Sequence, residues 1–221
     1  ERRRKAVELL GDLNGRTLLD VGCGSGALIE ALTSQQVEYH GIDYVPQMVQ
    51  HARACIEALG LGHRYHVSIG DAESLPFPAS TFDAVIGLGL LEYFDEPQRV
   101  IQETLRVVKP GGRLIFSIPR SFSPDDLLVR STGPLRAAVR RMIGQTPQVN
   151  HGSYTRKAFQ RLFTHFGCQV VGERTYKKMI LPYPVSRFWP RLAYGAAAWA
   201  DRKKGLDFFA TGYILACTKR A

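Results

Sequence analysis

Three glycines occupy every second position, Gly22, Gly24 and Gly26, directly after a short apolar segment, residues 17–21. This pattern is typical of a buried strand that runs into a tight turn, where a ligand can approach the bare backbone closely. Asp43 ends the next apolar segment, where a carboxylate can accept hydrogen bonds from ribose hydroxyls. Together the glycines and Asp43 predict a binding site for a nucleoside-containing cofactor.

The same glycines also fit, weakly, the fingerprint of dinucleotide-binding domains, but three features disfavour a dehydrogenase. Asp20 stands just before the first glycine, and no second nucleotide-binding half follows for a nicotinamide. A further acidic position, Asp71-Ala72, follows the third apolar segment, where an adenine amino group could be recognised. These features narrow the choice of cofactor to one that carries adenosine without a second nucleotide.

Short strands alternate with helices along the chain. We predict strands at 17–21, 39–43, 65–70, 82–87, 113–118, 169–173 and 213–218, and helices at 1–13, 27–34, 46–59, 96–108 and 154–167, with a Lys-Pro-Gly-Gly turn before the fifth strand. This alternation predicts an α/β fold with a doubly wound, mostly parallel sheet. Gly22, Asp43, Asp71 and Gly87 all fall at the carboxyl ends of predicted strands, where such sheets bind ligands.

Five motifs resemble, in order and spacing over about residues 15–119, those of class I S-adenosylmethionine-dependent methyltransferases of the small-molecule type. They are Leu18–Gly26, Gly41-Ile-Asp-Tyr, Gly70-Asp-Ala-Glu-Ser-Leu-Pro-Phe, Phe82-Asp-Ala-Val-Ile and Arg106-Val-Val-Lys-Pro-Gly-Gly-Arg-Leu. The resemblance implies a Rossmann-like sheet of seven strands with the last one antiparallel. We expect one domain over 1–221, with the cofactor-binding core at about 15–119. Substrate-side insertions, helical in part, are expected at about 120–153 and 175–210, after strands five and six.

The resemblance also assigns the S-adenosyl-L-methionine site residue by residue. Gly22, Cys23, Gly24 and Gly26 would pass under the methionine part, Asp20 would orient its amino group and Asp43 would accept the ribose hydroxyls. Tyr44 and Met48 would flank the adenine, Asp71 and Ala72 would contact its edge, and Gly87 and Leu88 would lie near the sulfonium. For Tyr44 and Met48, packing within the core is the alternative interpretation.

The implied reaction is an in-line displacement, in which the protein mainly aligns the acceptor with the methyl group and excludes water. It requires no metal, and the sequence contains no cluster with the spacing of metal ligands. His151 and Tyr154 are candidates for a general base or an acceptor contact. Tyr93 is a third, because it stands where many small-molecule relatives have histidine. A histidine that caps the following helix or lies in solvent is the alternative for His151.

Charge divides the chain into two unequal parts. Residues 1–119 contain 11 Lys and Arg against 15 Asp and Glu, whereas residues 120–221 contain 18 against 5. A basic amphipathic helix is predicted at 134–144, and residues 177–204 mix basic with aromatic side chains. The helix fits a lid packed on the core. Both segments also fit peripheral contact with a membrane or a lipid-like, anionic acceptor. Aromatic residues among basic ones suit nucleic-acid bases as well.

The leading hypothesis is methyl transfer to an oxygen, less readily a nitrogen, of a small or amphipathic organic acceptor. An RNA or protein methyltransferase is the first alternative, and a catalytically silent cofactor-binding module is the second. Nucleic acid is disfavoured, because the fourth strand ends in Gly87-Leu-Gly-Leu-Leu-Glu rather than in an Asn/Asp-Pro-Pro-aromatic motif. Four scattered cysteines and the lack of an apolar run of roughly 20 residues predict a cytoplasmic protein that can associate with membranes.

Overall fold

The computed structural model describes residues 1–121, 154–178, 189–201 and 210–220. Its strands are β1 (Thr17–Val21), β2 (Glu38–Asp43), β3 (Tyr65–Ile69), β4 (Phe82–Leu88), β5 (Val108–Pro119), β6 (Cys168–Lys178) and β7 (Ala210–Lys219). Its helices are α1 (Arg2–Leu10), α2 (Ile29–Leu32), α3 (Pro46–Ala58), the 3₁₀ helix η1 (Leu91–Tyr93), α4 (Pro97–Val107), α6 (Arg156–His165) and α8 (Pro190–Asp201).

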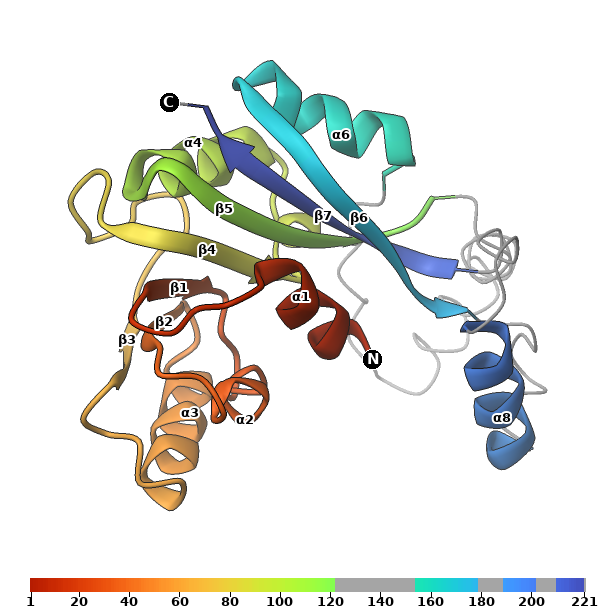
Figure 1. Cartoon of the computed structure of the whole chain (residues 1–221), viewed down its shortest axis with the longest axis horizontal. Helices are drawn as coiled ribbons and strands as arrows, with labels where there is room; N and C mark the ends of the chain where they lie inside the picture. The colour runs from red at the N-terminus through yellow and green to blue at the C-terminus, as the bar shows by residue number, and fades with distance from the viewer. Residues whose placement is uncertain (122–153, 179–188, 202–209, 221) are drawn as a thin grey trace, which may run out of the picture.

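All seven strands form one sheet in the order β3-β2-β1-β4-β5-β7-β6 (Figure 1). Strands β3, β2, β1, β4 and β5 pair in parallel, whereas β7 runs antiparallel to both of its neighbours, β5 and β6. The predicted α/β fold with a mostly parallel, seven-stranded sheet is therefore confirmed. The strand order reverses between β1 and β4, and such a reversal opens a crevice at the carboxyl ends of the strands.

Helices cover both faces of the sheet, so successive side chains of the central strands pack into two different cores. Leu18 packs in the core beneath α1, α2 and α3, whereas its neighbour Leu19 packs in the core beneath α4 and α6. Ile214 and Leu215 of β7 divide in the same way between the two cores. In this three-layer arrangement helices cover the two faces of the sheet, and loops cover the ends of its strands.

Two local expectations are wrong. The helix predicted at 27–34 is only the four-residue α2, because turn hydrogen bonds from Gly26 N to Cys23 O and from Ile29 N to Gly26 O extend the glycine loop. The turn predicted at Lys109-Pro-Gly-Gly lies inside β5, where the pairing with β4 shifts register. The remaining ends of the predicted elements differ by a few residues, most of all at β6, which continues to Lys178 and into the expected second insertion.

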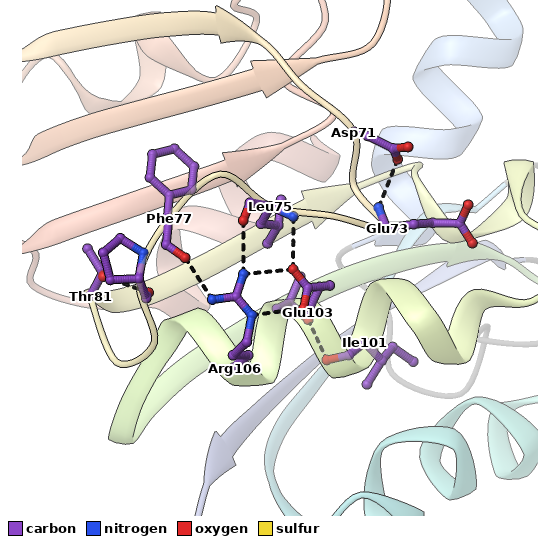
Figure 2. A network of polar contacts seen from close by, with 10 residues as sticks. Asp71, Glu73, Leu75, Phe77, Thr81, Ile101, Glu103 and Arg106 are labelled. Atoms are coloured by element: carbon purple, nitrogen blue, oxygen red, sulfur yellow. Dashed lines mark hydrogen bonds and ion pairs between the residues drawn. The ribbon is translucent and has the colours of Figure 1, made fainter.

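The loop after β3 is held in place by α4 (Figure 2). Arg106 donates hydrogen bonds to the carbonyl oxygens of Phe77 (2.7 Å) and Leu75 (2.9 Å), and it also pairs with Glu103 (2.7 Å). Glu103 in turn accepts a hydrogen bond from the backbone N–H of Leu75 at 2.8 Å. Because these contacts are charge-assisted, they fix the path of the chain just after Asp71.

Two sequence expectations lie outside the described residues, the basic helix at 134–144 and His151. All four cysteines are free, and Cys23, Cys168 and Cys217 are buried. No helix in the described part of the chain is long and apolar enough to cross a bilayer.

Candidate functional site

A cavity of about 720 Å³ opens at the carboxyl ends of the first four strands. Four segments surround it: the glycine loop, the residues after β2, the residues after β3 and the segment 89–94 after β4. The lining residues are Gly22, Gly24, Ile42, Asp43, Tyr44, Val45, Met48, Gly70, Asp71, Ala72, Glu73, Gly89, Leu90, Tyr93 and Phe94. The cavity therefore brings together seven of the twelve residues that the sequence predicts for the cofactor.

The first N–H groups of the glycine loop are already engaged. Gly22 N and Cys23 N both donate to Ile42 O at 2.9 Å, and Gly24 N donates to Asp43 Oδ2 at 2.8 Å. A pyrophosphate would need such N–H groups directed at it. The loop instead presents the backbone of Gly24, beside which a Cβ would meet no atom within 4 Å.

The polar side chains of the lining are dominated by carboxylates. Asp43 Oδ1 accepts a hydrogen bond from Val45 N at 2.9 Å, so both of its oxygens are oriented by backbone donors. Asp71 is held in the same manner by Glu73 N, which donates to Oδ1 at 2.9 Å (Figure 2). No Lys, Arg or His occurs among the described residues that line the cavity. Such a surface suits a ligand with hydroxyl and amino donors and a positive charge.

Asp20 lies beneath the cavity rather than in its lining. The residue is buried, and its Oδ2 accepts a hydrogen bond from the Tyr39 hydroxyl at 2.7 Å. Burial raises the pKa of Asp20 to about 7, the hydrogen bond from Tyr39 opposes this rise, and the charge of Asp43 adds to it. Asp20 is thus a buried carboxyl that titrates near neutral pH, next to the glycine loop.

Tyr44 and Met48 line the mouth of the cavity. Their side chains are 77% and 38% exposed, so they do not pack within the core. This exposure leaves both side chains accessible to a ligand.

Four other predicted cofactor residues do not line the cavity. Gly26 allows α3 to approach, because a Cβ there would lie 3.2 Å from Ala52 Cα, and Gly87 makes room for the ring of Phe116. Cys23 is buried, and Leu88 packs against the core beneath α1 to α3. These residues support the shape of the site from behind.

Of the two described candidates for acceptor contact, Tyr93 and Tyr154, only Tyr93 lines the cavity. Tyr93 lines the cavity and is 60% exposed. Tyr154 is not among the lining residues; its backbone pairs with the end of β5, and its side chain packs against the core beneath α4 and α6. The sequence interpretation did not assign Leu90 and Phe94 to the lining, although they lie within three residues of Tyr93.

A second hollow of about 940 Å³ lies between α4 and α6 and contains none of the predicted site residues. Leu162 and Phe166 line it together with the basic residues Lys157 and Arg161. None of its lining residues belongs to the glycine loop or to the segments after β2 and β3.

The core of the chain is similar to a known family of domains. Residues 19–116 match the family described as "Methyltransferase domain". Over 121 residues the chain is 37% identical to the ubiquinone biosynthesis O-methyltransferase of Coxiella burnetii, covering 54% of this chain and 51% of the relative. It is 34% identical over 141 residues to the phosphatidylethanolamine N-methyltransferase of Cereibacter sphaeroides, covering 64% of each. The chain thus spans about half the length of the first of these relatives.

The fold has close solved counterparts. Magnesium protoporphyrin IX methyltransferase from Synechocystis PCC 6803 superposes with a TM-score of 0.68 at 17% identity, covering 98% of this chain and 83% of that protein. At this level of identity the likeness concerns the fold alone. It extends over the second half of the chain, beyond the residues that match the family.

Proposed function

Because the chain carries a class I S-adenosyl-L-methionine-dependent methyltransferase domain, we propose that it transfers a methyl group to an oxygen or nitrogen of a small or amphipathic organic acceptor. One observation carries the proposal. The cavity beside the glycine loop is rich in carboxylates and has no cationic side chain among its described lining residues. This lining matches a cationic adenosyl cofactor and disfavours a dinucleotide, whose phosphates need positive partners.

The lining residues fit S-adenosyl-L-methionine group by group. Asp43 is positioned to accept the ribose hydroxyls, and Asp71 with Ala72 to contact the adenine edge. Tyr44 and Met48 offer apolar surface at the cavity mouth, and Gly24 leaves open backbone for the methionine part. When bound, the cofactor supplies an electrophilic methyl group on a sulfonium.

The contribution of the chain to catalysis is alignment and exclusion of water. Leu90 and Phe94 form an apolar wall of the cavity, which limits access of water to the reacting atoms. Tyr93 presents a hydroxyl at the same wall that can hydrogen-bond an acceptor and orient it. Tyr154 and His151 remain our further candidates for acceptor contact and for a base.

Calorimetry and a transfer assay test this function. We expect saturable binding of S-adenosyl-L-methionine and of its demethylated product, and no binding of NAD. With radiolabelled methyl donor, label should enter a prenylated phenol or phosphatidylethanolamine vesicles rather than unfractionated RNA or protein. Label confined to RNA or protein would favour the first alternative, and binding without any transfer would favour a silent module. Absence of cofactor binding would overturn the proposal.

Gly24 offers a matched test of the cofactor site. Gly24 and Gly15 both have a positive φ, +55° and +69°, and a Cβ at either position would meet no atom within 4 Å. Replacement by Ala should therefore cost each variant a similar free energy of unfolding, about 1–2 kcal/mol. Only Gly24→Ala should also weaken cofactor binding, by more than tenfold, because its methyl group enters the cavity. Equal affinities of the two variants in calorimetry would contradict the assignment of the cavity.

We also propose that α8 brings the protein to an anionic membrane surface, where an amphipathic acceptor resides. Trp189, Leu192 and Trp199 are 62%, 61% and 56% exposed, and the last two lie two turns apart on α8. Arg191 is exposed beside them. The excess of basic residues in the second half of the chain complements anionic lipid, and each cation near the surface contributes about 1 kcal/mol.

Vesicle co-sedimentation tests this membrane contact. We expect binding to phosphatidylglycerol vesicles at low salt and little binding to phosphatidylcholine. Leu192→Glu should weaken the binding at least about tenfold, because it removes an apolar contact and adds a negative charge. Leu59→Glu is the control, since Leu59 is also exposed but follows α3. Equal binding of the two variants would show that α8 is not the contact.

A further inference from the structure

Glu92 is a buried acid beside the cavity that the proposed reaction does not use. It lies in η1, within the segment 89–94, of which Gly89, Leu90, Tyr93 and Phe94 line the cavity. Glu92 itself is not among the lining residues, and it is only 9% exposed. Its side chain therefore belongs to the support behind the wall rather than to the wall.

The carboxyl group of Glu92 shares a small space with the guanidinium group of Arg2. A Cβ built on Gly89 would lie 2.8 Å from a guanidinium nitrogen of Arg2 and 3.2 Å from Oε1 of Glu92. Both charged groups thus lie close to the position that a side chain of Gly89 would occupy, and Gly89, with a positive φ of 72°, leaves room for them. Arg2 thus connects helix α1 with the segment 89–94 that follows β4.

Arg2 extends the contact to β6. Its guanidinium carbon lies 5.8 Å from the ring centroid of Tyr176, a buried residue. Tyr176 also fits against β7, because a Cβ on its pairing partner Gly212 would lie 2.3 Å from the Tyr176 ring. A glycine on β7 is therefore required for Tyr176 to occupy this position.

Ser117 closes the arrangement. Gly89 N donates a hydrogen bond to Ser117 Oγ at 2.9 Å, and Ser117 belongs to β5. Burial raises the pKa of Tyr176, the positive charge of Arg2 opposes this rise, and the negative charge of Glu92 adds to it. Arg2, Gly89, Glu92, Ser117 and Tyr176, called here the Glu92 cluster, thus join α1, β5 and β6 to one wall of the cavity.

A buried carboxylate is costly, and the cluster satisfies this one only in part. Among the described residues, Oε2 of Glu92 is a buried oxygen without a hydrogen-bond partner. An unsatisfied buried polar atom destabilises the folded state, and glutamine would avoid the cost of burying a charge at nearly the same volume. A buried, partly unsatisfied carboxylate beside a ligand cavity indicates that the charge of Glu92 has a role there.

We propose that Glu92 is a positioning residue for the proposed methyl transfer: through its attraction to Arg2, which contacts Tyr176, it holds segment 89–94 in the shape that forms the cavity wall. The inference rests on the proposed function, because the wall matters only if the cavity binds the cofactor. Loss of the negative charge relaxes Leu90, Tyr93 and Phe94 and weakens the binding of cofactor and acceptor together.

Acidification removes the same charge. Burial raises the pKa of Glu92 to about 6, while its own backbone N–H and the charge of Arg2 oppose the rise. Arg2 from α1 and Tyr176 from β6 are the titratable groups that face Glu92 among the described residues, and burial raises the pKa of Tyr176 further above its ordinary value of about 10. The contribution of Glu92 to cofactor affinity is therefore present at pH 8 and lost as the pH falls through about 6.

Cofactor affinity of wild type, Glu92→Gln, Arg2→Met and the double variant tests this role. At pH 8 each single variant should bind S-adenosyl-L-methionine about tenfold more weakly, and the double variant no more weakly than either single one. The ratio of the affinities of wild type and Glu92→Gln should fall from about ten at pH 8 to about one at pH 5. Asp20 titrates in both proteins, so this ratio isolates Glu92.

Arg4→Met is the matched control, since Arg4 lies on the same helix and pairs with Glu8 at the surface; its affinity should be unchanged. Tyr176→Phe changes another member of the Glu92 cluster and should also weaken cofactor binding. Because Glu92 is still present in this variant, its cofactor affinity should still fall as the pH falls through about 6. Additive effects of Glu92→Gln and Arg2→Met, or an affinity ratio that does not vary with pH, would overturn the inference. Failure of the wild type to bind the cofactor would instead refute the proposed function.

Discussion

Replacing Asp43 by Ala is expected to weaken the binding of S-adenosyl-L-methionine at least a hundredfold. Asp43 lines the cavity, and its two oxygens also accept hydrogen bonds from Gly24 N and Val45 N. The variant therefore loses the acceptor for the ribose hydroxyls and the support of the glycine loop at once. Charge-assisted hydrogen bonds contribute about 1.5–3 kcal/mol each, so two of them account for a loss of this size.

Calorimetry on Asp43→Ala, Asp43→Asn and Glu38→Ala separates these contributions. Asparagine keeps one oxygen acceptor for the backbone, so Asp43→Asn should bind more tightly than Asp43→Ala but less tightly than wild type. Glu38 stands at the exposed start of the same strand and contacts His40, so its replacement should leave the affinity unchanged. If Asp43→Ala bound within threefold of wild type, the assignment of the ribose contact would be wrong.

Replacing Asp20 by Asn is expected to stabilise the protein strongly at pH 8 and much less at pH 5. Burial raises the pKa of Asp20 to about 7, well above the value of about 4 in an unfolded chain. The folded state therefore favours the protonated form. Its stabilising contribution is fully present below about pH 4 and is lost as the pH rises through 7. A shift of this size corresponds to about 4 kcal/mol, since each pKa unit is worth about 1.4 kcal/mol.

Urea unfolding at pH 5 and pH 8 measures this effect. The wild type should lose stability between the two values, and Asp20→Asn should lose much less, with a smaller remainder from Glu92, whose pKa burial raises to about 6. Asp12→Asn, an exposed replacement that leaves the core untouched, should follow the wild type. Equal destabilisation of Asp20→Asn at both pH values would show that the hydrogen bond from Tyr39, rather than the buried charge, governs this position.

If Asp20 also orients the amino group of the cofactor, Asp20→Asn should lose affinity chiefly above pH 7, where the wild-type carboxyl is ionised. The same substitution would then raise stability and lower function. Such a trade-off is common where a site retains a buried charge for binding.

Much of the fold follows from local patterns. Strand β1 has the predicted bounds, since a short, mostly apolar run and the following glycines define a buried strand and its end within a few residues. The predicted helix at 27–34 was wrong because the glycine loop uses residues 27 and 28 for its own turns. A glycine-rich turn and the start of a helix compete for the same hydrogen bonds, and their outcome depends on packing against α3.

The sequence by itself determined the fold class and predicted the methyl donor and the strand ends proposed to hold it, because these depend on short-range periodicity and on motifs of a few residues. Only the tertiary structure decided which side chains face the cavity. Asp20 lies under the cavity, where Tyr39 donates a hydrogen bond to it. Leu90 and Phe94 form the cavity wall, and we propose that Glu92 supports that wall through Arg2 and Tyr176. The physical reason is that these contacts join strands and helices far apart in the chain, so sheet register and burial, rather than local pattern, set them.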